Sequence, residues 1–283
     1  MKAKTKGMIS ILIAAFGFSM MSVFVRLAGD LPSFEKAFFR NAVALAVVTG
    51  IMLRRHDSFR PQPGSLPALF GRAVFGTMGL LCNFYAIDHL VLADANMLNK
   101  LSPFFAILFS IFLLHEKPSW VQILGVATAF LGSVLIIKPS AGGYASLPAL
   151  VGLLGGMGAG VAYTFVRRLG QRGENSYFII FFFSAFSCLL CLPFLFVEST
   201  PLRLPSLLCL IGAGLFACVG QFGITRAYFY APAREISVYD YTQVIFAALF
   251  GFFIFDQVPD MWSVLGYCLI CGAGVGMFFY NQR

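Results

Sequence analysis

The sequence predicts an all-α membrane protein of ten transmembrane helices, arranged as two five-helix repeats of inverted topology with both termini cytoplasmic. Three observations lead to this fold class. The composition is strongly apolar, ten apolar runs are long enough to cross a bilayer, and several residues recur at one fixed offset between the two halves of the chain. The first excludes a water-soluble fold, the second sets the number of spans, and the third sets their arrangement.

The composition indicates that lipid surrounds most of the chain. Of 283 residues, 59% are hydrophobic and 11% are charged, and the mean hydropathy is +0.84. A soluble domain carries about 25% charged residues, and a soluble fold of this size could not bury so much apolar surface. The net charge of +8 is dispersed among apolar runs. It therefore favours a lipid bilayer over nucleic acid as the partner of the basic residues.

A helix that crosses the hydrocarbon core needs about 20 apolar residues. Such runs occur ten times, and short connections that contain proline or glycine separate them. The predicted spans cover 8–28, 34–53, 67–87, 93–114, 119–137, 147–169, 176–196, 205–230, 236–255 and 260–280. None of the connections is long enough to hold a soluble domain.

Lysine and arginine predict the orientation, because cytoplasmic loops carry an excess of both. With the N-terminus inside, five of the 20 basic residues fall outside and Lys100 falls within a span, which leaves fourteen inside. The five are Arg26, Lys36, Arg40, Lys138 and Arg203. This bias predicts cytoplasmic termini and a multi-pass protein of the bacterial inner (plasma) membrane.

The two halves of the chain share residues at an offset of 141 positions. The pairs are Gly17 with Gly158, Phe24–Arg26 with Phe165–Arg167, Pro118 with Pro259, and Gly125 with Gly266. We therefore expect one repeat over 1–140 and a second over 141–283. Five helices are an odd number, so the second repeat enters the membrane inverted relative to the first, as in many secondary carriers.

The chain resembles a known family over nearly its whole length. The supporting stretches are Tyr85–Leu98, Leu101–Ala106, Leu114–Glu116 with Pro118, and Gly125–Pro139. With two five-helix halves, they are similar to the ten-helix EamA-type branch of the drug/metabolite transporter superfamily. The resemblance implies alternating access around a central cavity lined by the first four helices of each half. The second half departs from the pattern at Gln243, which stands near where Pro103 would map.

Polar side chains within apolar runs need a partner or a water-filled cavity, because isolated charges in hydrocarbon are costly. Asn96, Asn99 and Lys100 are spaced to share one helix face, and Lys100 corresponds to Asp240 at an offset of 140. We expect these and their counterparts to bind substrate. The full set is Ser22, Arg40, Asn83, Asn96, Asn99, Lys100, Tyr163, Gln221, Tyr239, Asp240 and Gln243.

Several of these charges admit a second interpretation. Lys100 either pairs with Asp240 across the cavity or extends its ammonium to the outer interface. Asp240 either faces the cavity, where it could relay protons, or lies at the interface near Arg234. These alternatives remain open at the level of sequence.

Two further expectations concern structure. Arg26 lies on the side that the positive-inside rule disfavours, so it is expected either to face a mouth of the cavity or to pair with an acidic residue, for which Asp30 and Glu35 are the candidates. The glycines of the sixth and tenth helices predict close helix contact, and a dimer interface on the tenth is an alternative. They are Gly152, Gly155, Gly156, Gly158, Gly160, Gly272, Gly274 and Gly276.

No phosphate-binding loop or dinucleotide fingerprint occurs, and the three histidines lie at loops or helix ends. We therefore expect no cofactor, no metal and no nucleotide-driven transport. The sequence predicts a secondary active transporter of a small polar or zwitterionic metabolite, such as an amino acid or organic acid, and the resemblance favours export or exchange. One alternative is an uptake carrier for nucleoside-like compounds such as S-adenosylmethionine. The other is a membrane enzyme, which the short loops disfavour. We expect the protein to be a monomer or a homodimer.

Overall fold

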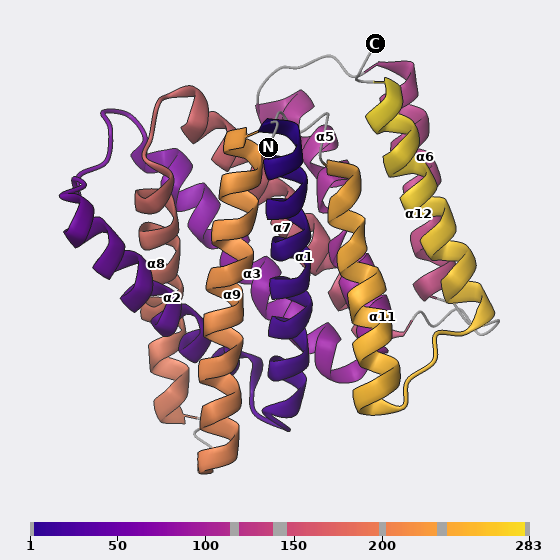
Figure 1. Ribbon diagram of the computed structural model, residues 1–283, viewed down its shortest axis with the longest axis horizontal. Helices are drawn as coiled ribbons and strands as arrows, with labels where there is room; N and C mark the ends of the chain where they lie inside the picture. Colours follow the sequence, from indigo (N-terminus) through magenta and orange to yellow (C-terminus); the bar gives the residue numbers. More distant parts are fainter. Residues whose placement is uncertain (1–2, 114–118, 138–145, 198–201, 231–236, 281–283) are drawn as a thin grey trace.

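The computed structural model describes residues 3–113, 119–137, 146–197, 202–230 and 237–280, and within these ranges the regular structure is helical throughout (Figure 1). Glu116, Pro118, Lys138 and Arg234 lie outside the described residues. The elements are α1 (Ala3–Leu27), α2 (Ser33–Arg55), α3 (Leu66–His89), α4 (Leu92–Asn99), α5 (Ser102–Leu113), α6 (Trp120–Ile137), α7 (Leu147–Gln171), α8 (Ser176–Val197), α9 (Leu204–Tyr230), the 3₁₀ helix η1 (Ser237–Tyr241), α11 (Thr242–Phe255) and α12 (Met261–Tyr280).

The ten predicted spans correspond in order to these helices, with the fourth and the ninth each divided in two. Within the described residues, eight segments are long and apolar enough to cross a membrane when α4 and α5 count as one. The remaining two are α3, which has 24 residues but carries Arg72, Asn83 and Asp88, and the shorter apolar stretch Tyr239–Phe255. The chain is thus an all-helical, multi-pass membrane protein.

The helices pack in the pattern of two related halves. α1 packs along α9, and the equivalent helix of the second half, α7, packs along α3. The remaining contacts follow the same pseudo-symmetry. α5 packs against α7, and its counterpart α11 packs against α1. α2 packs against its own counterpart α8, and α6 packs against its counterpart α12. Figure 1 shows α6 with α12 at one edge of the bundle and α2 with α8 toward the other. α1 begins and α12 ends at the same end of the bundle, which we call the N-terminal end; the opposite end is the far end.

The fourth span is two helices rather than the single one expected over 93–114. α4 ends at Asn99 and α5 begins at Ser102. Pro103 explains the break, because it has no N–H to donate to the carbonyl four residues earlier and its ring clashes with that carbonyl. In the second half, η1 covers the equivalent positions before α11 begins. The first break lies in the body of the bundle, as in transporters whose sites are built from discontinuous helices. We call the change from the 3₁₀ geometry of η1 to α11, which follows it directly, the second break.

Glycines bring α7 close to the first break. A Cβ atom at Gly160 would lie 2.7 Å from the Ser102 carbonyl oxygen, and one at Gly156 would overlap the Leu98 carbonyl. Side chains at either position would push α7 away from the break. The close contact predicted for the sixth helix is therefore confirmed. In the tenth helix, Gly274 faces the Tyr241 ring, whereas Gly272 has no neighbour that an added Cβ would meet.

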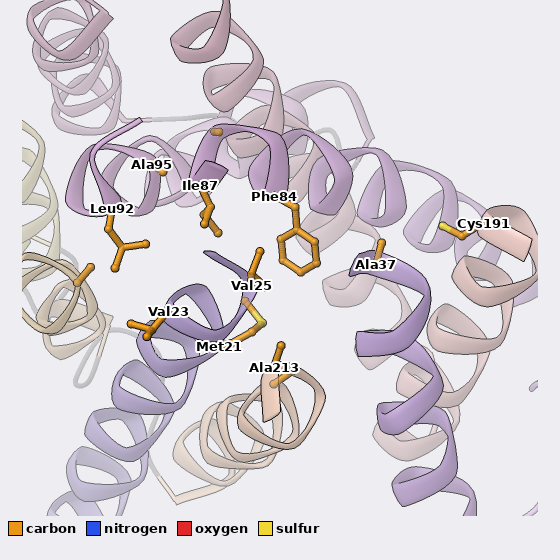
Figure 2. Close-up of a cluster of buried hydrophobic side chains, with 13 residues drawn as sticks. Met21, Val23, Val25, Ala37, Phe84, Ile87, Leu92, Ala95, Cys191 and Ala213 are labelled. Atoms are coloured by element: carbon orange, nitrogen blue, oxygen red, sulfur yellow. The ribbon is translucent and has the colours of Figure 1, made fainter. Parts of the chain in front are cut away.

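A cluster of buried apolar side chains fills the bundle toward the far end. Figure 2 shows side chains from α1, α2, α3, α4, α8 and α9 converging on one region. Phe84 and Leu92 are completely buried, and so is Ala213. Phe84, Leu92 and Ala213 each lie in the half of their helix that is nearer the far end. We call this group the far-end core, and it closes the bundle on that side.

Candidate functional site

A cavity of about 550 Å³ lies between the two halves of the chain. Its volume falls within the 300–1,000 Å³ range of small-molecule sites. Its apolar surface includes Phe18, Met21, Leu80 and Phe183. Its polar lining consists of Arg40, Arg72, Asn83, Asn99, Lys100, Ser102, Tyr163, Arg167, Gln221, Asp240 and Gln243. The cavity therefore runs from the middle of the bundle toward the N-terminal end, and both breaks open onto it.

The breaks place a charge pair in this cavity. The Nζ atom of Lys100 lies 2.6 Å from Oδ2 of Asp240, and the two side chains are 11% and 17% exposed. Of the two alternatives that the sequence left open for Lys100, the structure shows the pair with Asp240, and Lys100 is buried rather than extended to an interface. Oδ1 of Asp240 has no hydrogen-bond partner among the described residues. Burying two charges costs solvation even when they pair, so a pair in this place points to a functional role.

A buried hydrogen-bond network holds the elements beside the pair. The Oδ1 atom of Asn96 accepts hydrogen bonds from Ser22 Oγ at 3.2 Å and from Gln243 Nε2 at 2.7 Å. Ser19 Oγ donates to the Gln243 carbonyl at 2.7 Å. The network ties α1, α4 and α11 together. Asn96 and Ser22 lie outside the cavity lining, and the contacts described here give them a positioning role.

Two arginines approach one aromatic ring in the cavity wall. The guanidinium carbon of Arg40 lies 5.9 Å from the centre of the Phe183 ring, and that of Arg72 lies 4.1 Å from it. Nη1 of Arg40 donates to Oδ1 of Asn41 at 2.7 Å. Arg40 is 4% exposed. Arg40 therefore lies in the cavity wall, as predicted from the sequence.

The structure brings eight of the eleven predicted site residues to this cavity: Arg40, Asn83, Asn99, Lys100, Tyr163, Gln221, Asp240 and Gln243. Tyr163 is 45% exposed, and that surface faces the cavity. The other three, Ser22, Asn96 and Tyr239, are not in the lining. Tyr239 packs instead against Ile11 and Ala227.

Arg72, Arg167 and Phe183 line the cavity, although sequence reasoning did not select them. The two arginines were counted as cytoplasmic orientation charges. The sequence spacing could have identified Arg72 as a cavity residue. It shares one helix face with Gly76, Gly79 and Asn83, which follow at intervals of three and four residues. All four line the cavity.

Polar contacts join the elements at the far end. Nη1 of Arg26 donates to the Leu90 carbonyl at 2.8 Å and to Oε1 of Gln257 at 3.0 Å. The same Gln257 oxygen accepts the first amide of α4 at 2.9 Å. These bonds connect α1 with the segment between α3 and α4 and with the segment that follows α11. The pairing of Arg26 with Asp30 or Glu35 that the sequence suggested stays a prediction.

A second far-end contact joins α2 to α3. Nζ of Lys36 lies 2.6 Å from Oδ1 of Asp88, and the Lys36 side chain is 0% exposed. The Asp88 side chain is 20% exposed. Together with Arg26 and the far-end core, this pair holds the far end closed.

Replacing Asp88 by Asn should destabilise the protein markedly, because the Lys36 ammonium would remain buried without a counter-charge. Removing one partner of a buried pair costs roughly 3 kcal/mol or more. Thermal unfolding of the purified protein measures the effect. Asp57→Asn is the matched control, since Asp57 pairs at 3.3 Å with Arg55, whose side chain is 57% exposed; such pairs contribute about 1 kcal/mol or less. Equal midpoints for the two variants would contradict the role given to Lys36 and Asp88.

A family model matches both halves of the chain. The EamA-like transporter family matches residues 5–138 and again residues 146–279. One solved crystal structure superposes with a TM-score of 0.68 at 17% identity, covering 99% of this chain and 98% of that one. That likeness concerns the fold.

Curated relatives align along nearly the whole chain. A pseudopaline exporter of Pseudomonas aeruginosa is 34% identical over 275 residues, which cover 96% of this chain and 95% of the exporter. Solute carrier family 35 member G1 of Homo sapiens is 29% identical, with 95% of this chain and 78% of the relative covered. A riboflavin transporter of Brucella anthropi is 25% identical, with coverages of 93% and 94%.

Proposed function

Because this chain belongs to the EamA-like transporter family, we propose that it is a secondary active transporter that exports or exchanges a small zwitterionic metabolite, of the amino-acid or organic-acid type, by alternating access. The family and the relatives are transporters, so the alternative of a membrane enzyme is set aside. A small-molecule substrate and a bilayer are therefore its partners.

The observation that carries the proposal is the Lys100–Asp240 pair. It lies in the cavity with both side chains largely buried and at hydrogen-bonding distance. An ammonium group on the substrate can bind the unpartnered Oδ1 of Asp240, and a carboxylate can bind the remaining donors of Lys100 with the amide of Asn99. A zwitterion therefore matches the site at both ends.

The way in which the two halves meet supports alternating access. The pair joins one break from each half, and the far end is closed by the far-end core, the Arg26 contacts and the Lys36–Asp88 pair. Rocking of one repeat against the other around a site between them would open the far end and close the N-terminal end. Substrate binding would drive this change through differential affinity for the two states.

Export across a bacterial inner membrane, with both termini in the cytoplasm, is the direction that we propose. It is supported by the pseudopaline exporter among the relatives and by the predominance of lysine and arginine on the N-terminal side. In this orientation the cavity extends toward the cytoplasm, where an exporter collects its substrate.

Counterflow in proteoliposomes tests the proposal. The purified protein is first screened for thermal stabilisation by amino acids, organic acids and nucleosides, including S-adenosylmethionine. Liposomes are then loaded with each stabilising compound, and entry of its radiolabelled form is followed. We expect saturable counterflow for zwitterionic or carboxylate-bearing compounds, because one site that faces the two sides in turn exchanges solutes. Absence of counterflow for every stabilising compound would rule out a carrier.

A further inference from the structure

The two arginines near Phe183 form an unbalanced positive centre. Their guanidinium carbons lie 5.9 and 4.1 Å from the same ring centre, so the two like charges are at most about 10 Å apart. A cation–π contact contributes about 0.5–2 kcal/mol. That is small beside the cost of holding two charges of one sign inside a membrane protein. An anion is therefore the missing element of this centre.

The described part of the chain does not supply that anion. Its ion pairs join Lys36 to Asp88, Arg55 to Asp57 and Lys100 to Asp240. Neither Arg40 nor Arg72 takes part in an ion pair there, and the Nε atom of each is buried without a hydrogen-bond partner among the described residues.

Both arginines line the cavity that also contains the Lys100–Asp240 pair. A guanidinium group presents a rigid fork of donors that fits a carboxylate in a bidentate manner. The cavity thus offers a second place for a carboxylate, separate from the one at Lys100.

We propose that Arg40, Arg72 and Phe183, which we call the arginine subsite, bind a second carboxylate of the substrate. The transported molecule is then an amino acid, or an amino-acid conjugate, with at least two carboxylates. This inference rests on the proposed function, in which the Lys100–Asp240 pair holds the ammonium and its neighbouring carboxylate. The second carboxylate neutralises charge that a monocarboxylate would leave unbalanced, so the subsite determines specificity.

Matched pairs of compounds that differ in one carboxylate test the inference. The pairs are glutamate with glutamine and aspartate with asparagine. Thermal stabilisation of the purified protein is measured over a range of concentrations of each. We expect the member with the additional carboxylate to bind about 10- to 100-fold more tightly, the effect of one charge-assisted hydrogen bond.

Variants then assign the preference to the arginine subsite. Arg40→Gln and Arg72→Gln should each bring the affinity ratio within a pair close to one. Arg40→Lys and Arg72→Lys keep the positive charge but lose the bidentate guanidinium group. Their affinity ratios should therefore lie between those of the wild type and the Arg→Gln variants. Arg60→Gln is the matched control, because Arg60 is exposed and outside the cavity lining; its ratio should equal that of the wild type.

The outcomes separate this inference from the proposed function. Equal binding of both members in every pair by the wild-type protein, or an unchanged ratio in folded Arg→Gln variants, overturns the arginine subsite. Proteoliposome counterflow of the same compounds is measured in parallel. Binding with the expected ratios but without counterflow would retain the subsite and overturn the transport function.

Discussion

Lys100→Ala and Asp240→Asn should each reduce transport by about 100-fold or more, because each leaves a buried charge without its partner and removes one end of the zwitterion site. Both variants should still fold into the membrane, since the Asn96 network and the far-end core do not depend on the pair. Initial rates of counterflow, normalised to the amount of folded protein, measure the effect.

Two double variants separate substrate binding from structural support. Lys100→Met with Asp240→Leu removes both charges and should yield a folded but inactive protein, since a buried ion pair can be replaced by apolar residues without loss of stability. Lys100→Asp with Asp240→Lys restores the pair in reverse and should recover part of the transport. Wild-type rates in either single variant would remove the pair from the site.

Gly156→Ala should have the second large effect, on folding as well as on transport. A methyl group there would overlap the Leu98 carbonyl, two residues before Lys100. The backbone carbonyl of Leu98 cannot move aside as a flexible side chain can, so α7 and α4 must separate. We expect this to lower the free energy of unfolding by roughly 1–3 kcal/mol. Thermal midpoint and counterflow rate should both fall.

Gly170→Ala provides the control on the same helix, because an added Cβ at Gly170 meets nothing within 4 Å. Alanine also favours a helix over glycine by about 1 kcal/mol, so this variant should unfold at or slightly above the wild-type midpoint. If the two alanine variants have the same midpoint and the same rate, α7 does not set the position of the break.

The sequence predicted the helices and their repeat because these rest on long-range patterns. Apolar runs of about 20 residues are set by bilayer thickness, and an offset of 140, one residue from the repeat offset of 141, relates Lys100 to Asp240. The two breaks escaped prediction, since a hydropathy average over a whole span does not register the loss of one N–H at Pro103.

Individual side chains were harder to place, for local reasons. Asn96 and Lys100 are four residues apart and would share a face of a continuous helix. Lys100 is the C-cap of α4, with φ of −71° and ψ of 1°, and its amide still donates to the Asn96 carbonyl at 3.1 Å, so the two side chains differ in length and in partners. The cavity receives Lys100, whereas Asn96 turns to Ser22 and Gln243. Arg72 and Arg167 lie within two turns of helix ends, where a sequence does not distinguish a cavity residue from an interfacial one.

Chemical labelling from each side of the membrane tests most directly whether access to the cavity alternates. Ala106 lines the cavity, and Ala106→Cys in a variant without the seven native cysteines gives one reactive site. A membrane-impermeant thiol reagent is applied to oriented vesicles from the N-terminal side or from the far side. We predict fast labelling from the N-terminal side and slow labelling from the far side. Arg26→Ala with Gln257→Ala should increase the far-side rate, because it removes far-end contacts. Equal rates from both sides that these substitutions leave unchanged would show an open pore and contradict alternating access.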